Sequence, residues 1–134
     1  MHVQDMIRTA PGDTPVNVEP LAACIEACFD CAQTCAACSD ACLGEGSVRD
    51  LATCISLNEV CGDICATTGA ALSRIVHAQA LPLRSLLEAC ADACAKCAEE
   101  CERHAGHMEH CRVCAEACRR CETACRELIG MVAA

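Results

Sequence analysis

The stretch of sequence that decides the fold is Cys24-Ile25-Glu26-Ala27-Cys28-Phe29-Asp30-Cys31-Ala32-Gln33-Thr34-Cys35-Ala36-Ala37-Cys38-Ser39-Asp40-Ala41-Cys42. Its six cysteines follow one another at intervals of 4, 3, 4, 3 and 4 residues. Residues three and four apart lie on the same face of an α-helix, so these cysteines form one stripe along a helix. A helix in a bundle usually carries large apolar residues at such positions, whereas this helix carries a thiol at every one.

The rest of the chain repeats this spacing three times, and all 18 cysteines belong to one of four stripes. The three further stripes are Cys54, Cys61 and Cys65; Cys90, Cys94, Cys97 and Cys101; and Cys111, Cys114, Cys118, Cys121 and Cys125. Short connections between long helices favour antiparallel neighbours. We therefore predict an all-α fold, an antiparallel up-down-up-down four-helix bundle with a Cys-lined core.

Capping and helix-breaking residues predict the ends of the first two helices. The first helix should begin near Asn17, a good N-cap, and end at Gly44-Glu45-Gly46, where glycine can adopt the left-handed conformation. Ser47, with Asp50 three residues later, resembles a capping box and should start the second helix. This second helix is expected to run to about Val76.

The second half of the chain is divided in the same way. The segment His77–Leu81 is predicted to be the second turn, and Pro82 suits the first turn of the third helix. That helix should end near His104-Ala105-Gly106, and the fourth should cover roughly residues 107 to 132. Residues 1–16 contain several helix breakers and are predicted to be an N-terminal arm or a short helix. Residues 17–134 then form the bundle domain.

With antiparallel helices, the two ends of the predicted bundle differ in the residues that they carry. The apolar ends of the four helices should meet and form what we call the apolar plug, made of Leu21, Leu72, Ile75, Leu83, Leu87 and Leu128. The opposite end, here called the histidine end, should carry Gly44, Gly46, Gly106, His104, His107 and His110.

Composition excludes several classes of function. The formal net charge of −9 makes nucleic acid an unsuitable partner. The N-terminal residues lack a signal-peptide pattern, and no apolar stretch is expected to span a membrane, because charges interrupt each one. We therefore expect a cytoplasmic protein with reduced thiols, where dense cysteine indicates metal binding rather than disulfides.

Packing alone does not explain 18 cysteines, because leucine would bury more apolar area at each position. Charge balance favours Cu(I): one monovalent soft ion per thiolate keeps the core neutral, whereas Zn²⁺ with four thiolates leaves two negative charges at each site. Many CxxxC pairs indicate a store of metal rather than one catalytic centre, so no enzymatic activity is expected. A general zinc or cadmium buffer and a thiol-based redox protein remain as alternatives.

These stripes of CxxxC and CxxC pairs on four helices resemble the bacterial copper storage proteins, in their cytosolic form without an export signal. The resemblance covers residues 18 to 132. It implies storage of many Cu(I) ions inside the bundle, uptake through one end, and assembly as a homotetramer. Asn58 departs from the pattern, since it stands where a cysteine is expected between Cys54 and Cys61. Its amide oxygen could be a weak ligand or a hydrogen-bond partner of a thiol.

Histidines and outer helix faces complete the expectations. His104, His107 and His110 could capture and release copper at the histidine end, because imidazole binds copper and titrates near neutral pH. The candidate metal-binding residues are thus the 18 cysteines, these three histidines and Asn58. The first two helices carry a second apolar stripe, which includes Ile25, Phe29 and Leu57. We expect oligomerisation through these two helices.

Overall fold

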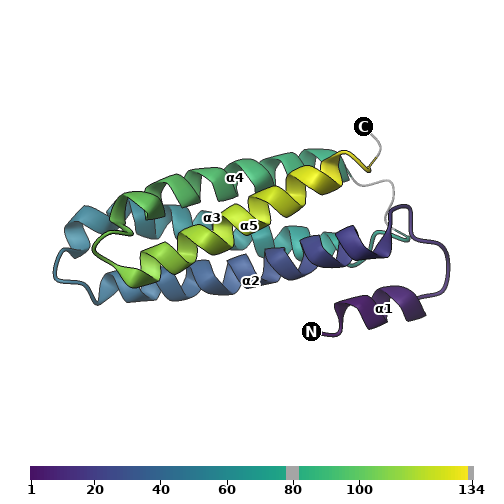
Figure 1. Ribbon diagram of the computed structural model, residues 1–134, viewed down its shortest axis with the longest axis horizontal. Helices are drawn as coiled ribbons and strands as arrows, with labels where there is room; N and C mark the ends of the chain where they lie inside the picture. Colours follow the sequence, from purple (N-terminus) through teal and green to yellow (C-terminus); the bar gives the residue numbers. More distant parts are fainter. Residues whose placement is uncertain (78–81, 133–134) are drawn as a thin grey trace.

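The computed structural model describes residues 1–77 and 82–132, and its regular elements are helices. They are α1 (Val3–Thr9), α2 (Val18–Leu43), the short 3₁₀ helix η1 (Val48–Leu51), α3 (Ala52–Leu72), α4 (Leu83–His104) and α5 (Glu109–Ile129). Figure 1 shows the four long helices aligned along one axis, with α1 lying beside α2. The predicted four-helix bundle is confirmed.

The long helices form a closed ring around the core. Helix α2 packs on α3 and α5, and α4 packs on the same two helices. Within the described parts of the chain, α2 makes no backbone-level contact with α4, nor α3 with α5. Each helix therefore has two neighbours and faces one partner across the core, which leaves a central column for side chains.

Two details at the first turn differ from the predictions. Gly44 follows α2 with φ −85°, in the right-handed region, so no left-handed glycine ends this helix. Ser47 makes no side-chain capping bond; its backbone carbonyl accepts a hydrogen bond from Asp50 N–H instead. The resulting η1 turn places Leu51 in the core with no exposed surface, so burial of Leu51 takes the place of a capping box.

The second helix is also shorter than predicted. Helix α3 ends at Leu72, and residues 73–77 continue as turns, in which Ile75 is still buried. The predicted turn His77–Leu81 lies largely outside the described residues, which exclude 78–81. Helix α5 begins at Glu109, two residues after the predicted start, because Met108 occupies its N-cap with extended backbone.

The core consists of a long sulfur column closed by apolar residues. All 18 cysteines are buried, and none exposes more than 2% of its surface. The six residues of the apolar plug are buried as well, with Leu83 the most exposed of them at 8%. The predicted division into a Cys-lined column and an apolar plug is therefore confirmed.

Small residues bring α2 and α3 close together. A Cβ atom at Gly69 would lie 3.0 Å from the ring of Phe29, which is tighter than a normal contact. At Gly62 the nearest atoms would be Ala32 O at 3.5 Å and Cys35 Cβ at 3.6 Å. Glycine at position 69 thus makes room for the only aromatic side chain of the protein, which lies over α3.

The composition of helix α2 differs from the prediction that no apolar stretch is long enough to span a membrane. Contrary to the expectation that charges interrupt every apolar stretch, α2 is long and apolar enough to cross a membrane, with a mean hydropathy of 1.3 in its best window. Half of that window is buried inside the bundle. Its apolar character is that of a core helix, and much of it comes from the cysteines that face the sulfur column.

Candidate metal centre

Each long helix contributes one stripe of cysteines to the sulfur column. Helix α2 provides six, α3 three, α4 four and α5 five, and all 18 are free thiols. Because the stripes face one another across the ring of helices, a cysteine meets thiols from its own helix and from its neighbours. The structure therefore brings every predicted cysteine to the same region.

Sulfur atoms in the column lie within a narrow range of distances. Cys31 Sγ is 3.8 Å from Cys35 Sγ, 4.0 Å from Cys61 Sγ and 3.7 Å from Cys118 Sγ. Cys65 Sγ is 3.5 Å from Cys94 Sγ, the shortest of these contacts. One ion placed between such sulfurs can therefore contact two or more of them without a large movement of the helices.

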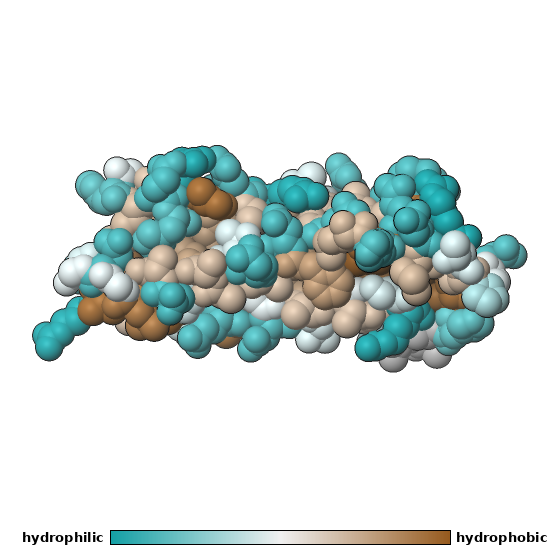
Figure 2. All heavy atoms as spheres, turned by 90° about the horizontal axis from the view of Figure 1, so that it is seen from below, coloured by the Kyte–Doolittle hydropathy of each residue, from teal (hydrophilic) through white to brown (hydrophobic). Residues whose placement is uncertain are grey.

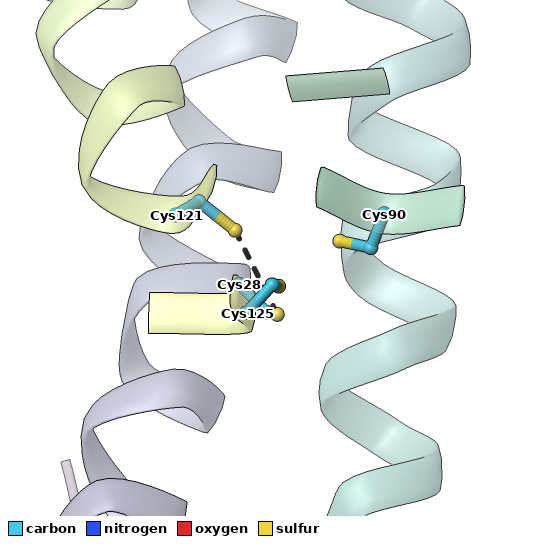
Figure 3. A group of neighbouring side chains, drawn as sticks. All are labelled: Cys28, Cys90, Cys121 and Cys125. Atoms are coloured by element: carbon cyan, nitrogen blue, oxygen red, sulfur yellow. Dashed lines mark hydrogen bonds between the residues drawn. The ribbon is translucent and has the colours of Figure 1, made fainter. Parts of the chain in front are cut away.

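Cysteines from different helices converge in groups of four. In each group the four Sγ atoms lie within 4.8 Å of one another. Figure 3 shows one group, Cys28, Cys90, Cys121 and Cys125, in which the side chains of three helices point toward a common centre. Four further groups are Cys31/Cys65/Cys94/Cys121, Cys31/Cys35/Cys61/Cys118, Cys35/Cys97/Cys114/Cys118 and Cys38/Cys42/Cys54/Cys111.

Four of these five groups share at least one member with another group, which links them along the column. Cys121 belongs to two groups, as do Cys31, Cys35 and Cys118. A thiolate in a shared position can bridge two soft ions. The arrangement therefore suits many ions held by common sulfurs better than a set of separate mononuclear sites.

Asn58 replaces a thiol inside the column and is fully buried. Its Oδ1 accepts S–H hydrogen bonds from Cys97 at 3.0 Å and from Cys114 at 3.2 Å. Cys101 donates to the same oxygen at 3.7 Å, and Asn58 Nδ2 donates to Cys54 Sγ at 3.8 Å. The amide is thus satisfied by thiols of three helices, which is the hydrogen-bonding role anticipated for it.

The three histidines occupy different environments at the histidine end. His110 Nδ1 lies 3.4 Å from Cys38 Sγ and 3.6 Å from Cys111 Sγ. His104 Nε2 instead forms a 2.7 Å hydrogen bond with Glu100, and His107 is exposed. Only His110 therefore makes a hydrogen bond to a thiol among the described histidines.

The structure reveals two carboxylates that sequence reasoning missed. Glu100 is only 8% exposed, and it pairs with His104 and with Arg103. Glu45 Oε1 lies 3.5 Å from His110 Nε2, a buried nitrogen that has no hydrogen-bond partner in the described chain. The i, i+4 spacing of Glu100 and His104 was a usable signal for the first pair, whereas no pattern connects residues 45 and 110.

Burial raises the pKa of two thiols near the histidine end. Removal from water, together with repulsion from Cys54 and Cys42 when these are ionised, raises the pKa of Cys111 to about 12. Burial also raises the pKa of Cys42. A free thiol has a pKa of about 8.5, so both groups remain neutral at physiological pH in the absence of metal.

Comparison with known proteins gives consistent matches along the chain. The family described as "Copper storage protein" matches residues 17–130. A structure of the copper storage protein Ccsp from Streptomyces lividans, loaded with 10 copper equivalents, is 53% identical and covers 97% of this chain and 99% of its own, with a TM-score of 0.93. Another structure of a Streptomyces lividans copper storage protein, with five coppers, is described as cytosolic; it is 54% identical, with a TM-score of 0.82 over 86% of this chain and 96% of its own.

More distant relatives come from Bacillus subtilis. The Cu(I)-bound copper storage protein 3 from that organism is 36% identical and covers 86% of this chain and 100% of its own, with a TM-score of 0.73. An uncharacterized cysteine-rich protein, YhjQ, is 38% identical over 90 residues, which are 67% of this chain and 78% of that protein.

We expect the reduced, metal-free protein to lose stability as the pH rises from about 9 toward 12. Thiols of the unfolded chain ionise near pH 8.5, whereas folded Cys111 keeps its proton until about pH 12. Its contribution is therefore fully present below about pH 8.5 and is lost as the pH rises through the folded pKa. Anaerobic urea unfolding at about pH 8 and about pH 10 measures this loss. Cys111→Ser should reduce the dependence on pH, and an unchanged free energy of unfolding in the wild type would contradict the expectation.

Proposed function

Because the chain belongs to the copper storage protein family, we propose that it stores many Cu(I) ions on the thiolates of its sulfur column, at roughly one ion per cysteine. The observation that carries this proposal is the set of overlapping groups of four buried cysteines. All 18 cysteines would be ligands, and none of them is committed to a disulfide.

Charge balance supports this stoichiometry. Each Cu(I) that replaces one thiol proton leaves the buried column neutral, so loading can continue without accumulating charge in a region of low dielectric constant. The exterior charge stays the same throughout. Such a protein acts by binding, and we propose no catalytic step for it. It works in the cytosol, as described for the Streptomyces relative.

We propose that copper enters and leaves at the histidine end. The apolar plug closes the opposite end with six buried side chains. At the histidine end, His110 lies against Cys38 and Cys111, so its imidazole can receive an ion and pass it to a thiolate without a long displacement. His104 and the exposed His107 would assist capture. Asn58 would assist as a hydrogen-bond acceptor, or as a weak ligand, farther inside.

We further propose a homotetramer assembled through α2 and α3. A groove of about 490 Å³ between these helices is lined by the small residues Ala32, Ala36, Ser39, Gly62 and Ala66 and, in addition, by Asn58, Glu59 and Asp63. Val60 is 51% exposed on the same pair of helices. Figure 2 shows apolar side chains along the middle of the face seen from below, between hydrophilic margins. On α4 and α5, by contrast, exposed ion pairs such as Arg119–Glu102 cover the seam.

Anaerobic titration of the reduced protein with Cu(I), against a chelator of known affinity, tests the storage function. We expect saturation at about 18 ions per chain and release of roughly one proton per ion, because each copper replaces one thiol proton. Circular dichroism should show a helical protein before copper is added, since neutral thiols already fill the core. Saturation near one metal per four cysteines, with zinc preferred, would favour a zinc buffer instead. Disulfide formation on mild oxidation, with no retention of copper, would favour a redox protein.

Replacement of His104, His107 and His110 together by Phe tests the route of copper. Uptake and chelator-driven release, followed by stopped-flow absorbance, should become severalfold slower, while the capacity should remain almost unchanged. Leu87→Ala in the apolar plug is the control: it should lower the free energy of unfolding by about 2–5 kcal/mol and leave the loading rate unchanged. If the histidine variant loads at the wild-type rate and the plug variant loads faster, copper enters at the plug end and the proposed route is wrong.

Sedimentation velocity tests the tetramer. The wild type should sediment as four chains of 14.0 kDa each. The combined variant Ala36→Glu and Val60→Glu should dissociate, because it places charges in the proposed interface. Val113→Glu on α5, which alters a similarly exposed valine, should remain tetrameric. A wild-type protein that sediments as a single chain would overturn the assembly.

A further inference from the structure

One group of four cysteines has a geometry that is nearly regular before any metal binds. In the group Cys31, Cys35, Cys61 and Cys118, four of the six sulfur–sulfur separations lie between 3.7 and 4.0 Å. The remaining two are within 4.8 Å. The four residues come from α2, α3 and α5, and all are buried.

This geometry matches a tetrahedral tetrathiolate site. Zn²⁺ binds sulfur at about 2.3 Å, and a regular tetrahedron with that radius has edges of about 3.8 Å. We propose that Cys31, Cys35, Cys61 and Cys118 form a preformed site for one divalent soft ion, Zn²⁺ or Cd²⁺, in the copper-free protein. This is a second binding activity, separate from copper storage.

The environment of the group can support its charge. Four thiolates around a divalent ion leave two negative charges, which a dry core tolerates only with nearby donors. Cys114 donates an S–H hydrogen bond to Cys35 at 3.8 Å, and Cys97 lies 4.0 Å from Cys35. Cys65 lies 3.9 Å from Cys61. While these neighbours keep their protons, they can donate to the bound thiolates.

Sharing of cysteines limits the number of divalent ions. The group Cys35/Cys97/Cys114/Cys118 uses two of the same sulfurs, and Cys31/Cys65/Cys94/Cys121 uses a third. An ion in the proposed site therefore prevents tetrahedral binding in either adjacent group. It also depends on protonated neighbours, which copper loading would remove. We thus expect the first divalent ion in the middle of the column, no divalent ion in the two adjacent groups, and displacement of the first ion as Cu(I) fills the bundle.

The test is anaerobic titration of the reduced, copper-free protein with Cd²⁺, followed by ¹¹³Cd NMR and by competition with a chelator. The first equivalent should give one resonance of the four-thiolate type. Cys61→Ser should weaken this binding at least tenfold. Cys42→Ser is the matched control, because Cys42 belongs to the group Cys38/Cys42/Cys54/Cys111, which shares no sulfur with the proposed site, and it should leave the first equivalent unchanged. Loss in Cys42→Ser but not in Cys61→Ser, or in neither variant, would overturn the assignment.

A second measurement needs no variant. X-ray absorption of the wild type with one Zn²⁺ equivalent should show four sulfur neighbours at about 2.3 Å, and a smaller number of sulfurs would overturn the proposal. The number of Cu(I) ions bound at saturation tests the storage function independently of the divalent site. Both serine variants should lose the same small share of bound Cu(I), whether or not the divalent site exists.

Discussion

The structure depends on one constraint: a sulfur atom in a dry core must carry either a proton or a metal ion. A thiolate without either would be an uncompensated buried charge, whereas a neutral thiol packs as a small apolar group. Because all 18 thiols have at most 2% exposure, ionisation of the column can proceed only as fast as cations enter it. The same side chains can therefore form the hydrophobic core of the empty protein and, as proposed, serve as the ligands of the filled one, so that folding would not have to wait for metal.

The helix arrangement makes this dual use of the core possible. A ring of four helices, in which opposite members do not pack backbone to backbone, leaves a column wide enough for sulfur from every side. Large buried apolar side chains lie at the plug end, at the η1 turn, where Leu51 is buried, and at the outer seams, where Phe29 lies over Gly69. Between the two ends, the buried side chains of the described residues that face the column are chiefly cysteines. Asn58 is accommodated there only because thiols of three helices satisfy its amide.

Sequence reasoning predicted the bundle and the buried cysteines well, because spacings of three and four residues translate directly into one face of a helix. It was less successful where tertiary contacts decide. The capping box at Ser47 was wrong because burial of Leu51 favoured a 3₁₀ turn, and α3 stops at Leu72 although the buried Ile75 continued the apolar pattern. The histidines were correctly placed at one end, and the i, i+4 spacing indicates the pairing of Glu100 with His104, but no spacing predicts the partners of His110. Glu45 and His110 are brought together only by the fold.

Shared sulfurs have a statistical consequence for a partly filled bundle. Because neighbouring groups overlap, a given number of ions can be distributed over the column in many ways of similar energy. If the 18 proposed positions behaved as equal and independent, this degeneracy alone would make the first ion bind about 300-fold more tightly than the last, a difference of about 3.4 kcal/mol. Part of any gradation in affinity would then come from mixing entropy rather than from differences between ligands. Scarce ions would be held firmly and the final ones would be the easiest to withdraw, without any dedicated weak site.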